Sequence, residues 1–120
     1  MDTRSKILSS SEAAQIALRA TVVSGYFDPL LAWHALRLQE LKAELKGDSP
    51  LLALIATPKH PILSARARAE LVAGLKVVDH VCEAPAPTEI ECIAPYFRLE
   101  DEERRKIREL IDRVHARHTS

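Results

Sequence analysis

Hydrophobic residues along the chain fall into short uninterrupted runs and into helical repeats. An apolar run without polar alternation predicts a strand that is buried on both faces of a sheet. Residues 51–56 form such a run, and β-branched residues predict a buried strand at 21–24. Further strands are expected at 77–82 and, as a weaker one, at 89–94. Apolar residues that recur every three or four positions predict amphipathic helices at residues 12–19, 30–46, 64–74 and 99–117. Because strands and helices alternate, we expect a three-layer α/β fold, a parallel sheet with helices on both faces.

Local signals set the expected ends of the helices. Ser9 and Glu12 have the spacing of a capping box, which opens the first helix, so that the helix and its cap span residues 9–19. Pro29 suits the first turn of the second helix, and Gly47 suits its end. Ser64 is expected to cap the third helix.

The same repeats predict which helix faces are buried. The inner face of the second helix is expected to hold Leu31, His34, Leu38, Leu41 and Leu45. Leu71 and Leu75 are expected on the inner side of the third helix. The last helix carries the apolar stripe Ile107, Leu110, Ile111 and Val114. This stripe is expected to pack against the sheet; the alternative is that it pairs with a second copy or docks on another protein.

Composition narrows the class of protein. With 120 residues, of which 47% are hydrophobic, we expect a single domain over residues 1–120, with its core at 20–94. Basic and acidic residues number 17 each, which argues against a general nucleic-acid binder. The first residues hold no apolar leader and the longest apolar run, 51–56, is too short for a bilayer, so we expect a cytoplasmic location and no membrane partner. Cys82 and Cys92 form no Cys-x-x-Cys pair, which predicts free thiols and no metal site.

The turn after the first predicted strand holds the candidate chemistry. Ligands of parallel sheets bind beyond the carboxyl ends of the strands, and here residues 26–29 connect such an end to a helix. Free amides at the start of that helix favour an anion, and Gly25 lets the backbone come close to it. His34 lies one turn into the helix and could donate a hydrogen bond to a phosphate; the alternative is a core histidine bonded to a carbonyl. Asp28 could likewise be only a turn and capping residue.

Residues 23–34 read Val-Ser-Gly-Tyr-Phe-Asp-Pro-Leu-Leu-Ala-Trp-His. This segment resembles the signature of cytidylyltransferase-like nucleotidyltransferases, Gly-x-Phe-Asp-x-x-His-x-Gly-His. The matching residues are Gly25, Phe27, Asp28 and His34, whereas Leu31 replaces a histidine and Trp33 a glycine. A second block, 68–79, is similar to the family segment in which an arginine, here Arg68, opens a helix and Val-Asp begins a strand. The likeness is greatest to glycerol-3-phosphate cytidylyltransferase and to the adenylyltransferase domain of heptose-phosphate enzymes.

The resemblance implies a Rossmann-like fold of the nucleotidyltransferase type, shortened at its C-terminal end. It implies a reaction in which a phosphorylated or alcohol-bearing substrate attacks the α-phosphate of CTP or ATP, with Mg²⁺ bound to the triphosphate. His34 would be the catalytic residue. The nucleotide and phosphate contacts would come from Gly25, Tyr26, Phe27, Asp28, Trp33 and Arg68.

The two replaced motif positions lower the expected activity. Leu31 cannot donate a hydrogen bond, and the indole of Trp33 would fill the space of the motif glycine unless it stacks on a base. We therefore expect a domain that binds a nucleotide or phosphorylated metabolite with its transferase activity reduced or lost. The alternatives are an active transferase that uses a sugar or polyol phosphate, and a non-catalytic module for interaction or homodimer formation.

Overall fold

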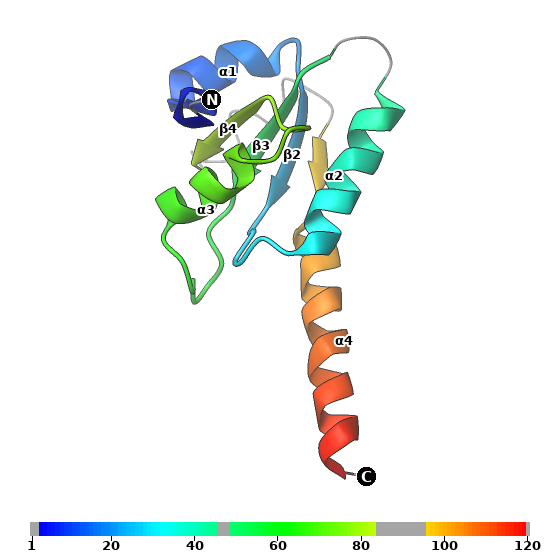
Figure 1. Cartoon of the computed structure of the whole chain (residues 1–120). Helices are drawn as coiled ribbons and strands as arrows, with labels where there is room; N and C mark the ends of the chain where they lie inside the picture. The colour runs from blue at the N-terminus through cyan, green and yellow to red at the C-terminus, as the bar shows by residue number, and fades with distance from the viewer. Residues whose placement is uncertain (1–2, 46–48, 84–95, 120) are drawn as a thin grey trace.

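The protein folds around a parallel sheet of five strands in the order β1-β4-β3-β2-β5 (Figure 1). The computed structural model describes residues 3–45, 49–83 and 96–119. The strands are β1 (Ile7–Leu8), β2 (Thr21–Gly25), β3 (Leu51–Ile55), β4 (His80–Glu83) and β5 (Tyr96–Arg98). The helices are η1 (Thr3–Lys6), α1 (Ser10–Ala17), α2 (Ala32–Glu44), α3 (Ala65–Ala73) and α4 (Glu100–Thr119). All four strand pairs are parallel, which confirms the expected Rossmann-like α/β fold.

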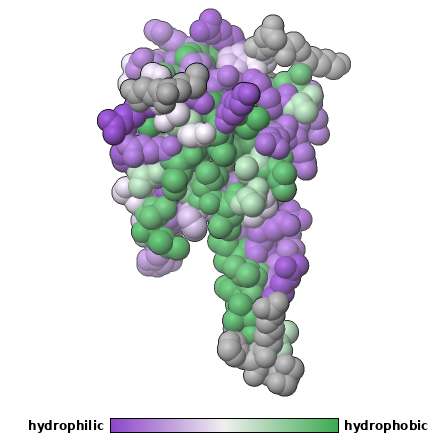
Figure 2. All heavy atoms as spheres, in the orientation of Figure 1, coloured by the Kyte–Doolittle hydropathy of each residue, from purple (hydrophilic) through white to green (hydrophobic). Residues whose placement is uncertain are grey.

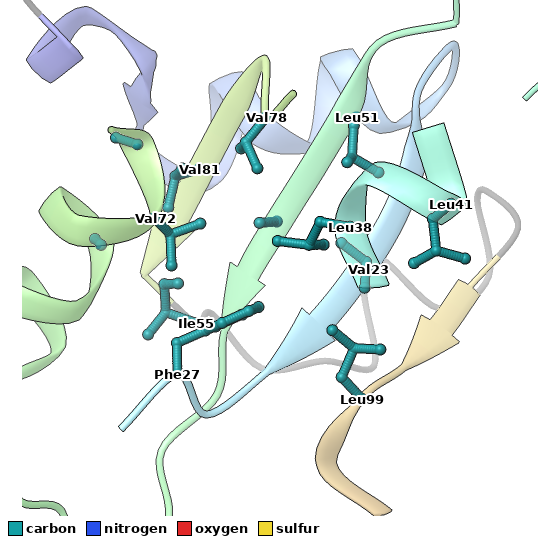
Figure 3. Packing of buried hydrophobic residues seen from close by; sticks show 13 residues of the cluster. Val23, Phe27, Leu38, Leu41, Leu51, Ile55, Val72, Val78, Val81 and Leu99 are labelled. Atoms are coloured by element: carbon teal, nitrogen blue, oxygen red, sulfur yellow. The ribbon is translucent and has the colours of Figure 1, made fainter. Parts of the chain in front are cut away.

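The sheet separates two hydrophobic cores, because successive side chains of a strand point to opposite faces. On one face, strand residues such as Val23 and Ile55 pack with Leu38 of α2 and Val72 of α3 (Figure 3). On the other face, α1 packs its alanines on residues that include Leu52. Both β2 and β3 are buried along their whole length, as the β-branched residues of β2 and the apolar run of β3 predict.

Side-chain caps begin α1 and α3 as the sequence predicts. Ser9 and Glu12 form the capping box of α1, and the Ser64 hydroxyl accepts a hydrogen bond from the amide of Ala67 in α3. The expected start of α2 is wrong by about half a turn, since the helix begins at Ala32 and Pro29 lies in the preceding loop. Gly47 lies outside the described residues.

Three predictions about helix faces are wrong. Leu31 is 44% exposed, because it precedes α2 as its N-cap instead of lying on its inner stripe. Leu71 is 47% exposed, because α3 turns the face with Arg68 and Val72 inward. The apolar stripe of α4 does not pack on the sheet, and its four residues are 47–57% exposed.

Helix α4 begins at the carboxyl edge of the sheet and projects away from it (Figure 1). Only its first turns are buried, through Glu100 and Glu103, together with the preceding Leu99. Figure 2 shows the apolar stripe as a green band along the projecting part. Among the described helices, none combines the length and the hydropathy that a membrane span requires.

The short strands β1 and β5 are additions that the apolar runs do not predict, since they span two and three residues. The strand expected at residues 89–94, with Cys92, lies outside the described residues.

Candidate functional site

The candidate site lies where the order of strands in the sheet changes direction. From β2 the chain continues to β3 and β4 on one side, whereas β5 pairs with β2 on the other side. The connections that leave β2 and β5 diverge at such a point and open a crevice, which is the usual ligand position in parallel α/β sheets. In this protein the loop after Gly25 contacts the start of α4 at this point of the sheet.

Three donors converge on one carboxylate at this edge of the sheet. The amide of Tyr26 donates to Oε1 of Glu103 at 2.7 Å, and the amide of Phe27 donates to Oε2 at 2.9 Å. The Nε2 atom of His34 lies 2.9 Å from the same Oε2. We call these two amides and the imidazole the anion cradle. The sequence predicts these donors for a phosphate, and the structure brings them together around a glutamate of the same chain.

The tautomer of His34 follows from its partners. Its Nδ1 atom accepts a hydrogen bond from the amide of Leu31 at 2.9 Å, so the proton of the neutral ring must sit on Nε2. That proton points at Glu103, which makes the imidazole a donor to the cradle. His34 is buried, yet it contacts an amide and a carboxylate rather than the carbonyl of the alternative interpretation.

Gly25 provides the space that the cradle needs. A Cβ atom at this position would lie 2.8 Å from the ring of Phe27 and 3.0 Å from Oε1 of Glu103. Phe27 is fully buried and has a positive φ of 49°, which folds its ring back towards Gly25. The loop therefore presents its amides to Glu103 only because residue 25 has no side chain.

Two further predicted site residues join loops instead of facing the cradle. The carboxylate oxygens of Asp28 accept hydrogen bonds from the amides of Ile62 and Leu63, at 2.7 and 2.8 Å. Arg68 is 1% exposed and donates to the carbonyls of Tyr26 and Ala56, at 3.0 and 2.6 Å. Both side chains connect the loop after β2 to the segment after β3. They therefore fix the conformation of the loop that carries the cradle amides.

The aromatic residues lie at the border of the site. The indole of Trp33 stacks on the imidazole of His34, with ring centroids 4.1 Å apart. The hydroxyl of Tyr26 accepts a hydrogen bond from Arg104 at 2.6 Å, and the guanidinium lies over the tyrosine ring.

Glu100 and Glu103 are functional candidates that the sequence does not reveal. Glu100 lies about one helical turn before Glu103. Both of its carboxylate oxygens lie within hydrogen-bond distance of the Ser24 hydroxyl, at 2.7 and 2.9 Å. Both carboxylates are buried, whereas the acidic start of this helix suggests only a favourable interaction with the helix dipole. Their spacing of three residues places them on one helix face, and that spacing is the one signal that could have found them.

Burial and hydrogen bonds shift the pKa values of several titratable groups away from the cradle. Burial alone would raise the pKa of Asp79, but hydrogen bonds from Lys42 and from the amide of Leu51 hold it below its usual value. Burial raises the pKa of the Cys82 thiol to about 11, with a further contribution from Glu83. Burial also lowers the pKa of His80, whose Nδ1 atom has no hydrogen-bond partner. Within the described ranges, no three His, Cys, Asp or Glu side chains gather as they would around a metal ion.

No protein-family model matches the sequence, and no curated protein is similar enough to it to identify a relative. The fold and the site define the class: a Rossmann-like α/β domain with an anion cradle at the point where the strand order changes direction.

Proposed function

We propose that this domain binds a phosphoryl group of a nucleotide or phosphorylated metabolite in the anion cradle, in competition with Glu103. The observation that supports the proposal is the convergence of Tyr26, Phe27 and His34 on one pair of carboxylate oxygens. Donors at the start of a helix and on the loop before it suit phosphate oxygens as well as carboxylate oxygens. In this view Glu103 stands in for the ligand while α4 is docked.

Competition with Glu103 makes binding weaker than the cradle alone would allow. Undocking α4 breaks the hydrogen bonds to Glu103, which should cost about 1–3 kcal/mol in total. A ligand that binds only the open form has an apparent affinity that falls in proportion to the open fraction. A phosphoryl dianion carries more charge than a carboxylate, which favours it for the same donors.

The likeness to cytidylyltransferase-like enzymes leads us to propose a nucleotide such as CTP or ATP as the ligand, with transferase activity reduced or lost. Position 31 offers an exposed leucine side chain where the family motif has a histidine. Asp28 and Glu100 already accept hydrogen bonds from the protein. Mg²⁺ would therefore enter with the triphosphate, whose charge it neutralises.

A non-catalytic interaction module is the second candidate function. The observation that favours it is the docked state itself, in which Glu103 satisfies all three cradle donors and is buried. In that case the former ligand site serves only to anchor α4.

A calorimetric titration with CTP and ATP, with and without Mg²⁺, separates the two candidates. In Glu103→Ala the cradle is open, so we expect nucleotide affinity to rise at least about tenfold, which corresponds to about 1.4 kcal/mol. Glu109→Ala is the matched control, because it makes the same charge change on the exposed part of α4 and should leave affinity unchanged.

A second substitution identifies the site of binding. Adding His34→Gln to Glu103→Ala removes the imidazole donor and should weaken nucleotide binding again. If Glu103→Ala is folded by circular dichroism yet releases no heat at millimolar nucleotide, the binding proposal is wrong and the interaction module remains.

A further inference from the structure

The projecting part of α4 is a surface without an intramolecular partner among the described residues. Its stripe consists of Ile107, Leu110, Ile111 and Val114, spaced by three, one and three residues along one helix face. These four side chains are 47–57% exposed. Residues 104–119 extend for about 24 Å at 1.5 Å per residue.

The stripe continues the helix face that docks on the body. Glu100 and Glu103 precede Ile107 by seven and four residues, so all three share one face. Both glutamates contact the body through Ser24 and the cradle. The stripe therefore looks towards the side on which the body lies, into the corner below the carboxyl edge of the sheet (Figure 2). A rod can enter such a corner along the stripe, whereas a flat bilayer would meet the body first.

Three residues of the stripe have the spacing of a short two-stranded coiled-coil seam. In heptad notation Ile107 and Val114 take position a and Leu110 takes position d, and β-branched residues at a with leucine at d favour pairs of helices. The stripe contains no tryptophan or phenylalanine, which helices that lie on membranes commonly use as anchors.

Charge selects the kind of helix that can pair with this seam. The flanks of the stripe hold cations from Lys106, Arg108 and Arg113, whereas Arg104 already bonds to Asp101 and to the Tyr26 hydroxyl. Glu109 falls on the opposite face of the helix, and Asp112 borders the hollow that Ile107 and Ile111 line. An antiparallel pair of α4 helices would bring the flanking cations Lys106 and Arg113 of the two copies together, whereas a partner with acidic flanks would meet them with charge of opposite sign.

We propose that the projecting part of α4 binds an amphipathic helix of another protein, whose aliphatic stripe is flanked by acidic residues. The inference is independent of ligand binding, because it rests on the exposed stripe and its cationic flanks.

The test uses two designed helical peptides with the same isoleucine and leucine seam. One peptide carries glutamate at the flanking e and g positions, and the other carries lysine there. We expect the glutamate peptide to bind with a micromolar dissociation constant that weakens at least tenfold between 50 and 500 mM salt, because the flanking ion pairs are screened. The lysine peptide should not bind. Equal binding of both peptides, or of neither, would overturn the proposal.

Two variants locate the binding surface. Ile107→Ser with Leu110→Ser removes half of the stripe and should abolish binding of the glutamate peptide without changing thermal unfolding, since both side chains are largely exposed. Leu36→Ser is the matched control, because Leu36 is 60% exposed on α2 and its loss should leave peptide binding intact. Retained binding in the double variant would contradict the assignment.

Two further measurements distinguish other occupants of the stripe. Light scattering should give the mass of a monomer, and vesicles of phosphatidylcholine and phosphatidylglycerol should not sediment the protein. A dimer that dissociates in the Leu110→Ser variant would show that a second copy occupies the stripe. Sedimentation with vesicles that the double variant loses would assign it to anionic lipid. Either result would overturn the proposed partner.

Discussion

Helices α2 and α4 carry the same kind of apolar repeat and have opposite environments. In α2, the residues His34, Leu38 and Leu41 are buried against the sheet. In α4, the stripe that begins at Ile107 is about half exposed along its length. The difference comes from topology, because α2 lies between β2 and β3 and must return along the sheet, whereas α4 leaves the carboxyl edge after β5. An apolar repeat thus predicts that one face of a helix will be buried. The position of the helix between strands determines whether the sheet is what buries it.

The two halves of α4 sharpen the same comparison within one helix. Its first turns replace apolar contacts with two buried carboxylates, which bond to Ser24 and to the cradle. The second half keeps aliphatic residues that are about half exposed. Helix α4 is therefore anchored by polar contacts in its first turns and exposes apolar residues in its second half. The following predictions test both properties.

The largest effect is expected from truncating a leucine in each helix. Leu38→Ala in α2 should lower the free energy of unfolding by about 2–5 kcal/mol, because Leu38 is fully buried and leaves a cavity. Leu110→Ala in α4 should change it by less than about 0.5 kcal/mol, because Leu110 is 57% exposed. Urea denaturation measures both. Equal losses in the two variants would mean that the stripe of α4 is covered in solution.

A smaller effect is expected from removing a glutamate in each half of α4. Glu103→Ala leaves the amides of Tyr26 and Phe27 without their partner, which should cost about 1–3 kcal/mol of stability. Glu109→Ala on the projecting part should cost almost nothing. The same denaturation experiment checks both variants, and a Glu103→Ala protein as stable as the wild type would show that α4 is not anchored at the cradle.

The smallest effect concerns an ion pair in the body and one on α4. Lys42 lies 2.7 Å from the carboxylate of Asp79, which also accepts a hydrogen bond from the amide of Leu51 at the start of β3. Arg104 and Asp101 form a pair that is mostly exposed. Asp79→Asn should cost less than about 1 kcal/mol at pH 7, and Asp101→Asn should have no measurable effect.

The pH dependence of the Asp79 contribution follows from the sign of its pKa shift. Because the folded state holds the pKa of Asp79 below the usual 3.8, its stabilisation is present above that value and is lost as the pH falls through the folded pKa. Unfolding measured between pH 7 and 2.5 should show the difference between wild type and Asp79→Asn shrinking at the acidic end. A difference that stays constant would contradict the role of the ionised carboxylate.

Much of the fold could be predicted because its signals are local. The capping residues Ser9 and Ser64 act within three residues of themselves. Strand 51–55 is an uninterrupted apolar run, and strand 21–25 carries β-branched residues before a glycine. The orientation of α3 could not be predicted from apolar spacing, because the buried Arg68 finds its partners in two distant loops. A prediction that places every arginine on the exposed face therefore buries the wrong face of α3.

The candidate site was predictable in its donors and not in their partner. Gly25 and His34 stand close together in sequence at a strand-helix junction, which is a local pattern. Glu103 follows Phe27 by 76 residues, and nothing in the sequence of α4 links it to that loop. Long-range pairs of this kind depend on the strand order, which places β5 beside β2.

Docking through Glu103 also gives the protein two built-in reporters of its own motion. The amide protons of Tyr26 and Phe27 are held by a carboxylate from the other end of the chain and not by a neighbouring strand. The rate at which these amide protons exchange with solvent deuterium therefore reports how often α4 undocks. The exchange rates of the β3 amides report how often the whole sheet unfolds. The exchange rate of either cradle amide, divided by the intrinsic rate of an unprotected amide, gives the fraction of time that α4 spends undocked.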